Sequence, residues 1–416
     1  MKKSGMILEW TKAACICLLV AGYLAWAGQA GAQGAGTAKA PGGGATVKPV
    51  TGTGMAKAGT TSSRQTVKHA DTVGTGVKPA TQTPAAAATS VADKKPPANA
   101  PSTTAGLTRE ILELTGGRRT KILWTRGTRA DGGLLMCFDT AEGKERAIIQ
   151  APKVCFDAKL TPDGKRVIFC VPSEQASYIV NWDGTGLKPL FKGRHYYALG
   201  VAHDPTTGVD WVYVGDNMSA EARADIQSQG LSISLGSGFT IHRHRLDNLA
   251  IKEKVWDKTT FSTRVIVNPG GASLAGEFPW PNCGVAALPN GEFKLYGQGC
   301  NGSLSPDGSR FFLLLGDHRR LKISSVDGSE ENQFSVNTMP GNEKDPKRAV
   351  WRPKWSNQVR FMSIQSADQG TDADIAIGRF DENFSKIEAW VRVTDTPEYD
   401  SDSSVWIESD PGIARK

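Results

Sequence analysis

The feature that most constrains the fold of this chain is a turn followed by a strand, which occurs twice. Residues 161–169 read Thr-Pro-Asp-Gly-Lys-Arg-Val-Ile-Phe, and residues 305–313 read Ser-Pro-Asp-Gly-Ser-Arg-Phe-Phe-Leu. Pro sets φ for the turn, Asp can bond back to the backbone, and Gly accepts a positive φ. A unit this small cannot bury its own apolar face, so its copies must stack on one another. The sequence therefore predicts a repeat architecture.

The rest of the chain beyond residue 120 is also typical of short strands. Its apolar stretches are brief, rich in β-branched and aromatic residues, and bounded by Gly, Asp, Asn or Pro. Helical periodicity is nearly absent, and we expect short helices only at 108–114 and 219–229. The predicted strands are 121–125, 134–138, 146–149, 167–171, 178–182, 211–214, 239–241, 311–315, 321–323, 359–363, 375–377 and 389–393.

The period of the repeat distinguishes among all-β folds. Degenerate copies of the unit begin near residues 202 and 351, so that one unit spans about 40 to 50 residues and contains about four strands. A unit of this length and strand number is one blade of a β-propeller. The sequence thus predicts an all-β fold, a β-propeller of about six four-stranded blades over residues 106–416.

These units resemble those of the TolB-like, WD-repeat-like β-propellers, in which a Ser-Pro-Asp-Gly turn precedes an apolar strand. Residues 161–169 and 305–313 match that element, and residues 178–187 and 374–380 match the strand and Asp-Gly turn that follow it. The resemblance covers most of 118–395. It implies the fold but no single activity, because the family includes periplasmic scaffold proteins, carbohydrate-active enzymes and regulatory domains of peptidases.

The first 32 residues have the three parts of a secretory signal peptide. Lys2 and Lys3 form a positive start, residues 13–27 are apolar, and Ala30-Gly31-Ala32 is an A-x-A cleavage site. The apolar run is short for a membrane span, which needs roughly 20 residues. An uncleaved anchor is the alternative, and it would be the chain's only contact with a membrane. We expect an exported protein, periplasmic or extracellular.

Residues 33–105 predict a disordered linker, since Ala, Gly, Thr, Pro and Lys dominate and large apolar side chains are rare. This linker also carries most of the formal net charge of +7: residues 1–32 contribute +2, residues 33–105 contribute +6, and residues 106–416 contribute −1. The folded part is therefore nearly neutral, and the linker has no aromatic residues for base stacking. We expect no nucleic-acid partner.

Five cysteines follow the leader, so at least one of them is a free thiol. Export permits disulfides, and we expect one between Cys283 and Cys300, which border loops on either side of a predicted strand pair. Cys155 could pair with Cys137 or with Cys170. No C-x-x-C motif follows the leader, so the spacing does not fit a zinc site.

The residues that could carry chemistry are few. No G-x-S-x-G motif for a nucleophilic serine occurs. His242 and His244 alternate on a predicted strand and so share a face; with His318 they could bind a divalent metal. Oligogalacturonate lyases, which are also propellers, use a His-based metal site. We favour the alternative that these histidines are strand residues bordering a polar channel.

Two further segments are candidate ligand-binding sites. Asp317, His318, Arg319 and Arg320 follow a predicted strand and could hold a carboxylate or phosphate, although a network that closes a blade turn is the preferred interpretation. Trp280 lies in a Pro-rich loop, where it could stack on a sugar or a peptide or plug the loop.

Together these features favour an exported, non-enzymatic propeller without a cofactor. It would bind a protein or glycan partner at the cell envelope through its loop face or its central channel. The alternative is a carbohydrate-active enzyme, a metal-dependent polysaccharide lyase that uses His242, His244, His318 and Arg319.

Overall fold

The computed structural model describes residues 104–127, 133–149, 155–193, 197–217, 238–258, 265–278, 280–342, 345, 347–366 and 372–409. The predicted signal peptide at 1–32, the linker up to residue 103 and the helix expected at 219–229 lie outside the described residues.

The described residues form six antiparallel sheets of four strands each. Blade 1 contains β1 (Thr120–Arg126), β2 (Leu134–Asp139), β3 (Lys144–Ala147) and β24 (Asp400–Ile407), and blade 2 contains β4 (Phe156–Leu160), β5 (Arg166–Val171), β6 (Ala176–Asn181) and β7 (Lys188–Lys192). Blade 3 contains β8 (Tyr197–Asp204), β9 (Val209–Asn217), β10 (Gly238–Arg245) and β11 (Lys252–Trp256), and blade 4 contains β12 (Ile266–Val267), β13 (Ser273–Glu277), β14 (Asn282–Ala287) and β15 (Phe293–Gln298). Blade 5 contains β16 (Cys300–Leu304), β17 (Arg310–Leu314), β18 (Arg320–Ser325) and β19 (Glu331–Ser335), and blade 6 contains β20 (Trp351–Trp355), β21 (Phe361–Gln365), β22 (Ile375–Phe380) and β23 (Ile387–Arg392).

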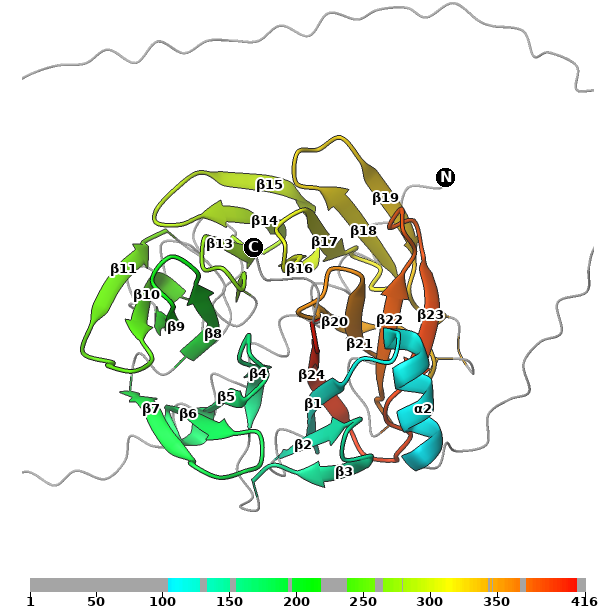
Figure 1. Ribbon diagram of the computed structural model, residues 1–416. Coiled ribbons are helices and arrows are strands. Elements are labelled where there is room, and N and C mark those ends of the chain that lie inside the picture. The colour runs from blue at the N-terminus through cyan, green and yellow to red at the C-terminus, as the bar shows by residue number, and fades with distance from the viewer. Residues whose placement is uncertain are drawn as a thin grey trace, which may run out of the picture. The chain divides into compact units, whose positions relative to one another are not determined.

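The blades follow one another around a ring (Figure 1). The prediction of a β-propeller with about six four-stranded blades is confirmed. The two matching phrases found in the sequence lie at the same place in blades 2 and 5, where each joins the first strand of the sheet to the second. There Asp163 Oδ1 accepts a hydrogen bond from the Lys165 N–H at 3.0 Å, and Asp307 Oδ1 accepts one from the Ser309 N–H at 3.1 Å.

The ring closes in blade 1, where the last strand of the chain joins the first three. β24 pairs with β1 from Thr120 opposite Ile407 to Arg126 opposite Asp400. At the end of this pairing Arg126 Nε lies 2.8 Å from Oδ1 of Asp400, whose side chain is fully buried. Closure pairs an edge strand that would otherwise stay open.

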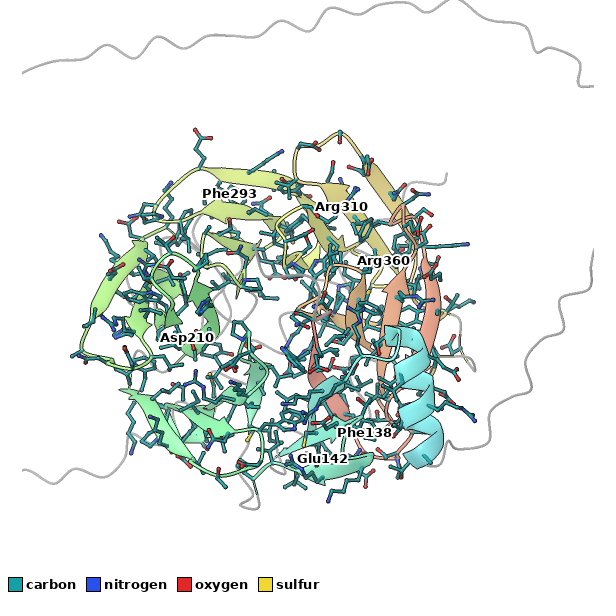
Figure 2. All side chains as sticks on the ribbon, in the orientation of Figure 1. Phe138, Glu142, Asp210, Phe293, Arg310 and Arg360 are labelled. Carbon is teal, nitrogen blue, oxygen red and sulfur yellow. The ribbon has the colours of Figure 1, made fainter. Side chains whose placement is uncertain are left out.

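The apolar core lies between neighbouring blades, where side chains from adjacent sheets fill the space (Figure 2). Blades 1 and 2 are also joined by a buried lysine. Lys121 Nζ donates a hydrogen bond to the Gly164 carbonyl at 2.7 Å and lies 5.0 Å and 5.3 Å from the ring centres of Trp182 and Trp406. Burial lowers the pKa of Lys121.

In the part of the chain that the structure describes, two helical segments accompany the strands: α2 (Thr104–Thr115) and the short 3-10 helix η1 (Pro172–Glu174). The helix predicted at 108–114 is confirmed as part of α2, which buries Ile111 and Leu114 against blades 1 and 6. Arg379 Nη1 donates to the Leu114 carbonyl at 2.9 Å and so satisfies one acceptor at the helix C-terminus. Among the described residues, no helix has the length and apolarity that a membrane span requires.

Candidate functional site

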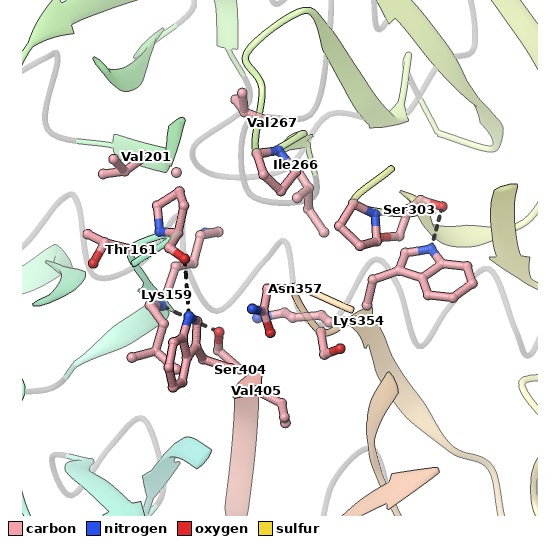
Figure 3. A pocket seen from close by; sticks show the side chains of 18 of the residues that line it. Lys159, Thr161, Val201, Ile266, Val267, Ser303, Lys354, Asn357, Ser404 and Val405 are labelled. Carbon is pink, nitrogen blue, oxygen red and sulfur yellow. Dashed lines mark hydrogen bonds between the residues drawn. The ribbon is translucent and has the colours of Figure 1, made fainter. Parts of the chain in front are cut away.

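A pocket of about 120 Å³ lies at the centre of the ring, where one edge strand of every sheet faces inward (Figure 3). These inner strands are β24, β4, β8, β12, β16 and β20. The pocket is lined by residues of all six inner strands and the turns after them, so it belongs to the ring as a whole and not to any single blade.

The inner strands of four blades carry the same irregularity. In β4, β16, β20 and β24, three steps along the strand match two steps along its neighbour, which is a β-bulge with one extra residue. In each bulge one residue other than glycine has a positive φ: Asp157 (51°), Asn301 (55°), Arg352 (52°) and Asp402 (55°).

This backbone conformation costs on the order of 1–2 kcal/mol for an ordinary residue, although Asp and Asn tolerate it best. Arg352 is the exception, and Pro353 after it disfavours the right-handed helical conformation that would be an alternative. Backbone strain of this kind gathers at functional sites. Because this strain recurs around the ring, the side chains at the bulges are candidate functional residues.

Three of the four bulges hold a buried cluster of charged side chains. Lys159 Nζ lies 2.5 Å from Asp157 Oδ2, and Arg352 pairs with Asp402. Lys354 Nζ lies between the two acids, 3.6 Å from Asp157 Oδ1 and 3.8 Å from Asp402 Oδ1. The cluster thus joins blades 2, 6 and 1 at one side of the channel.

Lys354 differs from the other cations of this cluster. Its side chain is 14% exposed, and its Nζ makes no hydrogen bond within the described part of the chain. Burial lowers the pKa of Lys354, while the carboxylates of Asp402 and Asp157 oppose that effect. An ammonium group has three hydrogen-bond donors. Lys354 therefore lines the pocket and carries unused donors on an Nζ that is closed to water in this structure.

The opposite side of the pocket is apolar. Val201, Ile266 and Val267, from β8 and β12, line it, and Figure 3 shows Val201 and Val267 across from Lys354 and Ser404. Trp355 and Trp406 fix the walls between these sides, because their Nε1–H groups donate to the Ser303 and Pro162 carbonyls at 3.2 Å and 3.1 Å. The pocket therefore presents cations on one side and aliphatic side chains on the other.

Sequence reasoning named the central channel but missed Lys159 and Lys354. Lys159 lies two residues before Thr161, and Lys354 lies two residues before Ser356. Each of these hydroxyl residues begins the turn that follows its inner strand. Ser303 has the same place before Ser305, and all three of these inner-strand residues line the pocket. An alignment of the repeats on their turns, followed by a search for charge at this place, would have found the two lysines.

The segment 316–320 lies in the turn between β17 and β18. Asp317 Oδ1 accepts from the N–H of Arg319 at 3.0 Å, and Oδ2 accepts from Arg320 Nε at 2.7 Å. Burial opposes ionisation of Asp317, but these hydrogen bonds outweigh it and lower its pKa. The ring of His318 lies edge-on to Trp351, with ring centres 4.2 Å apart. Asp317, Arg319 and Arg320 are not among the residues that line the central pocket.

The three histidines considered for a metal site lie in different blades. His242 and His244 are on β10 of blade 3, whereas His318 follows β17 in blade 5. His244 Nδ1–H donates to the Leu249 carbonyl at 2.7 Å, and its ring packs on Phe191. No group of three His, Cys, Asp or Glu side chains among the described residues has a metal-binding arrangement.

Trp280 lies in the loop before β14 and is partly buried, and its Nε1–H contacts Cys300 Sγ at 3.2 Å. Cys283 on β14 and Cys300 on β16 are both buried. A disulfide between them stays a prediction.

Neither a protein-family model nor a curated protein matches the sequence. Among solved structures, the chain is similar to TolB from Acinetobacter baumannii, with 13% identity, a TM-score of 0.49, and 71% of this chain and 69% of that chain covered. It is also similar to a putative TolB from Agrobacterium tumefaciens, with 14% identity, a TM-score of 0.42, and 70% and 99% covered. A chain of a nidogen/laminin complex matches with 10% identity, a TM-score of 0.43, and 69% and 98% covered. These likenesses concern the fold, which the six sheets already establish.

Proposed function

We propose that this chain is an exported, non-enzymatic β-propeller that binds a polypeptide partner at the cell envelope through its central pocket. The observation that carries the proposal is the pocket itself, which is lined by residues of all six inner strands. It combines buried cations on one side with an aliphatic wall on the other. Export is supported by the signal-like segment at 1–32.

The lining of the pocket favours a polypeptide over a glycan. Its volume is about 120 Å³, and lysines lie on one side of it and aliphatic residues on the other. A side chain or a chain end can offer an acidic group on an apolar stem, whereas a sugar ring presents hydroxyl groups on most of its surface. The rest of the partner would lie on the loops around the channel mouth, which is a common use of a propeller.

Selection from a random peptide library displayed on phage tests the proposal. We expect the wild-type protein to enrich peptides that lose binding to Lys354→Met but keep it to Lys188→Met, because Lys188 is an exposed lysine on β7. Failure to enrich any pocket-dependent peptide would contradict the proposal.

A second measurement addresses the enzymatic alternative. Purified protein, with and without added divalent metal, would be incubated with acidic polysaccharides, and unsaturated product would be followed by ultraviolet absorbance. We expect no turnover. Turnover that depends on His242 or His244 would replace the binding function with that of a lyase.

A further inference from the structure

We infer that the group recognised in the central pocket is a carboxylate on a short aliphatic stem, held by Lys354. The inference rests on the proposed function and specifies which chemical group of the partner the pocket accepts.

Lys354 has hydrogen-bond donors that no group in the described residues accepts. Its Nζ is held 3.6 Å and 3.8 Å from Asp157 and Asp402, too far for a hydrogen bond with either. Burial lowers the pKa of Lys354, and these acids oppose that effect but leave its protons unpaired. Once the Lys354 side chain turned its Nζ into the pocket, a ligand oxygen would complete the site, since an ionised donor and acceptor make the strongest hydrogen bonds.

The same acids select for one negative charge. A phosphate dianion next to Lys354 would place two charges near both Asp157 and Asp402, and like charges at this range repel strongly where water is scarce. A carboxylate carries a single charge. Ser404 on β24 adds a hydroxyl to this side of the pocket, where its Oγ already accepts the Leu160 N–H at 3.4 Å and its proton remains for a ligand oxygen.

The other side of the pocket is an aliphatic wall formed by β8 and β12. Val201 and Val267 are each 6% exposed, and Ile266 lies beside them. Of these three side chains, Ile266 is the one that is only partly buried, so it has the most apolar surface left to cover. An aliphatic stem would cover that surface, at about 25 cal/mol for each Å² removed from water. The pocket therefore fits the side chain of a glutamate, the carboxyl end of a chain that finishes in an aliphatic residue, or a free short-chain acid.

Titration of the full-length protein with butyrate, followed by saturation-transfer NMR, tests the inference directly. We expect butyrate to bind with a dissociation constant in the millimolar range, because it has few atoms. Butyramide has nearly the same shape but no charge, and we expect it to bind at least ten times more weakly.

Variants test the cationic side and the aliphatic side of the pocket separately. Lys354→Met should reduce butyrate binding at least tenfold, while Lys188→Met should not change it. Ile266→Ser should weaken butyrate and leave acetate, which has almost no stem, unchanged. Urea denaturation of each variant establishes that it is folded, and Lys354→Arg, which keeps the charge, provides a second folded variant that should retain binding.

The peptides from the phage selection separate the sources of the carboxylate. Synthetic copies would be compared with a free or an amidated carboxyl end, and with each Glu replaced by Gln. Loss on amidation identifies a chain end, and loss on Glu→Gln identifies a side chain; either supports the inference. Pocket-dependent peptides that tolerate both changes, together with equal binding of butyrate and butyramide, would overturn the inference and leave the proposed function standing. Absence of pocket-dependent peptides would instead remove the proposed function.

Discussion

At the scale of single residues, Lys354 ties ligand binding to pH. Burial lowers its pKa below that of an ordinary lysine, and the charged groups that face it are Asp157 and Lys159 from β4, Arg352 from β20 and Asp402 from β24. An anion binds the protonated ammonium. We therefore expect butyrate affinity to be full where butyrate is ionised and Lys354 is protonated, and to fall as pH rises through the lowered pKa of Lys354, before free lysines deprotonate near 10.4.

The Lys354→Arg variant is the control for this pH dependence, since guanidinium keeps its proton throughout the range. Its affinity for butyrate, measured by NMR titration at several pH values, should stay level where that of the wild type falls. A parallel decline in both proteins would assign the titration to another group.

A second residue-scale prediction concerns Lys121, which joins blades 1 and 2. Lys121→Met keeps most of the stem but removes the cation between Trp182 and Trp406 and the charged hydrogen bond to the Gly164 carbonyl. Relief of the cost of burying a charge offsets part of this loss. We expect the free energy of unfolding to fall by about 1–3 kcal/mol in urea denaturation. Lys165→Met, at an exposed position in the adjacent turn, should leave stability nearly unchanged.

At the scale of elements, the two matching turns form a natural experiment. Gly164 and Gly308 have φ of 67° and 74°, so alanine strains both turns. A Cβ at Gly164 would lie 2.5 Å from the Trp406 ring, whereas one at Gly308 would have no atom within 4 Å. We expect Gly308→Ala to cost about 1 kcal/mol of unfolding free energy and Gly164→Ala about 2–4 kcal/mol, measured in urea.

The comparison between the two alanine variants also reports on the pocket, because Trp406 lines it. Butyrate binding should weaken in Gly164→Ala and persist in Gly308→Ala. Equal stability and equal binding in the two variants would show that the Trp406 ring can move away from the added Cβ without loss of unfolding free energy.

The strands that the sequence predicted most clearly are those packed on both faces. β5, β17 and β21 are strongly apolar, with residues such as Phe169, Phe312 and Ile364 buried between blades, and apolar runs predict them well. None of the inner strands, β4, β8, β12, β16, β20 and β24, was predicted from its own residues. Their sequences contain Ala, Gly, Ser, Lys and Asp because one face borders a polar channel, so alternation of apolar residues is weak.

The site was harder to predict than the fold for a related reason. The bulges in the inner strands depend on positive φ at Asp157, Asn301, Arg352 and Asp402. Positive φ at residues other than glycine leaves little mark on a sequence, and for Arg352 it leaves none. The turn chemistry of the repeat predicts blades, but only the ring brings Lys159 and Lys354, almost 200 residues apart, into one pocket.

At the scale of the whole molecule, the ring depends on β24. A chain ending at residue 399 would lose this strand and leave β1 with an open edge and Arg126 without Asp400. Open edges pair with other chains. We expect this truncated protein to elute from size-exclusion chromatography as larger assemblies, with a urea midpoint well below that of the full chain.

Addition of a synthetic peptide of residues 400–409 should restore a species of the single-ring size, and a peptide of scrambled order should not. Elution of the truncated protein at the single-ring size without the peptide would show that closure of blade 1 is dispensable.

The pairing of β1 with β24 also sets a schedule for biosynthesis. Arg126 and Asp400 are 274 positions apart in the sequence. At about 5–20 residues per second, a ribosome needs roughly 14 to 55 seconds to travel between them. Until β24 has been made, blade 1 can contain only β1, β2 and β3, and the nascent chain cannot close the ring. Until β24 has been synthesised the ring therefore stays open, and any process that needs unfolded polypeptide has that interval in which to act.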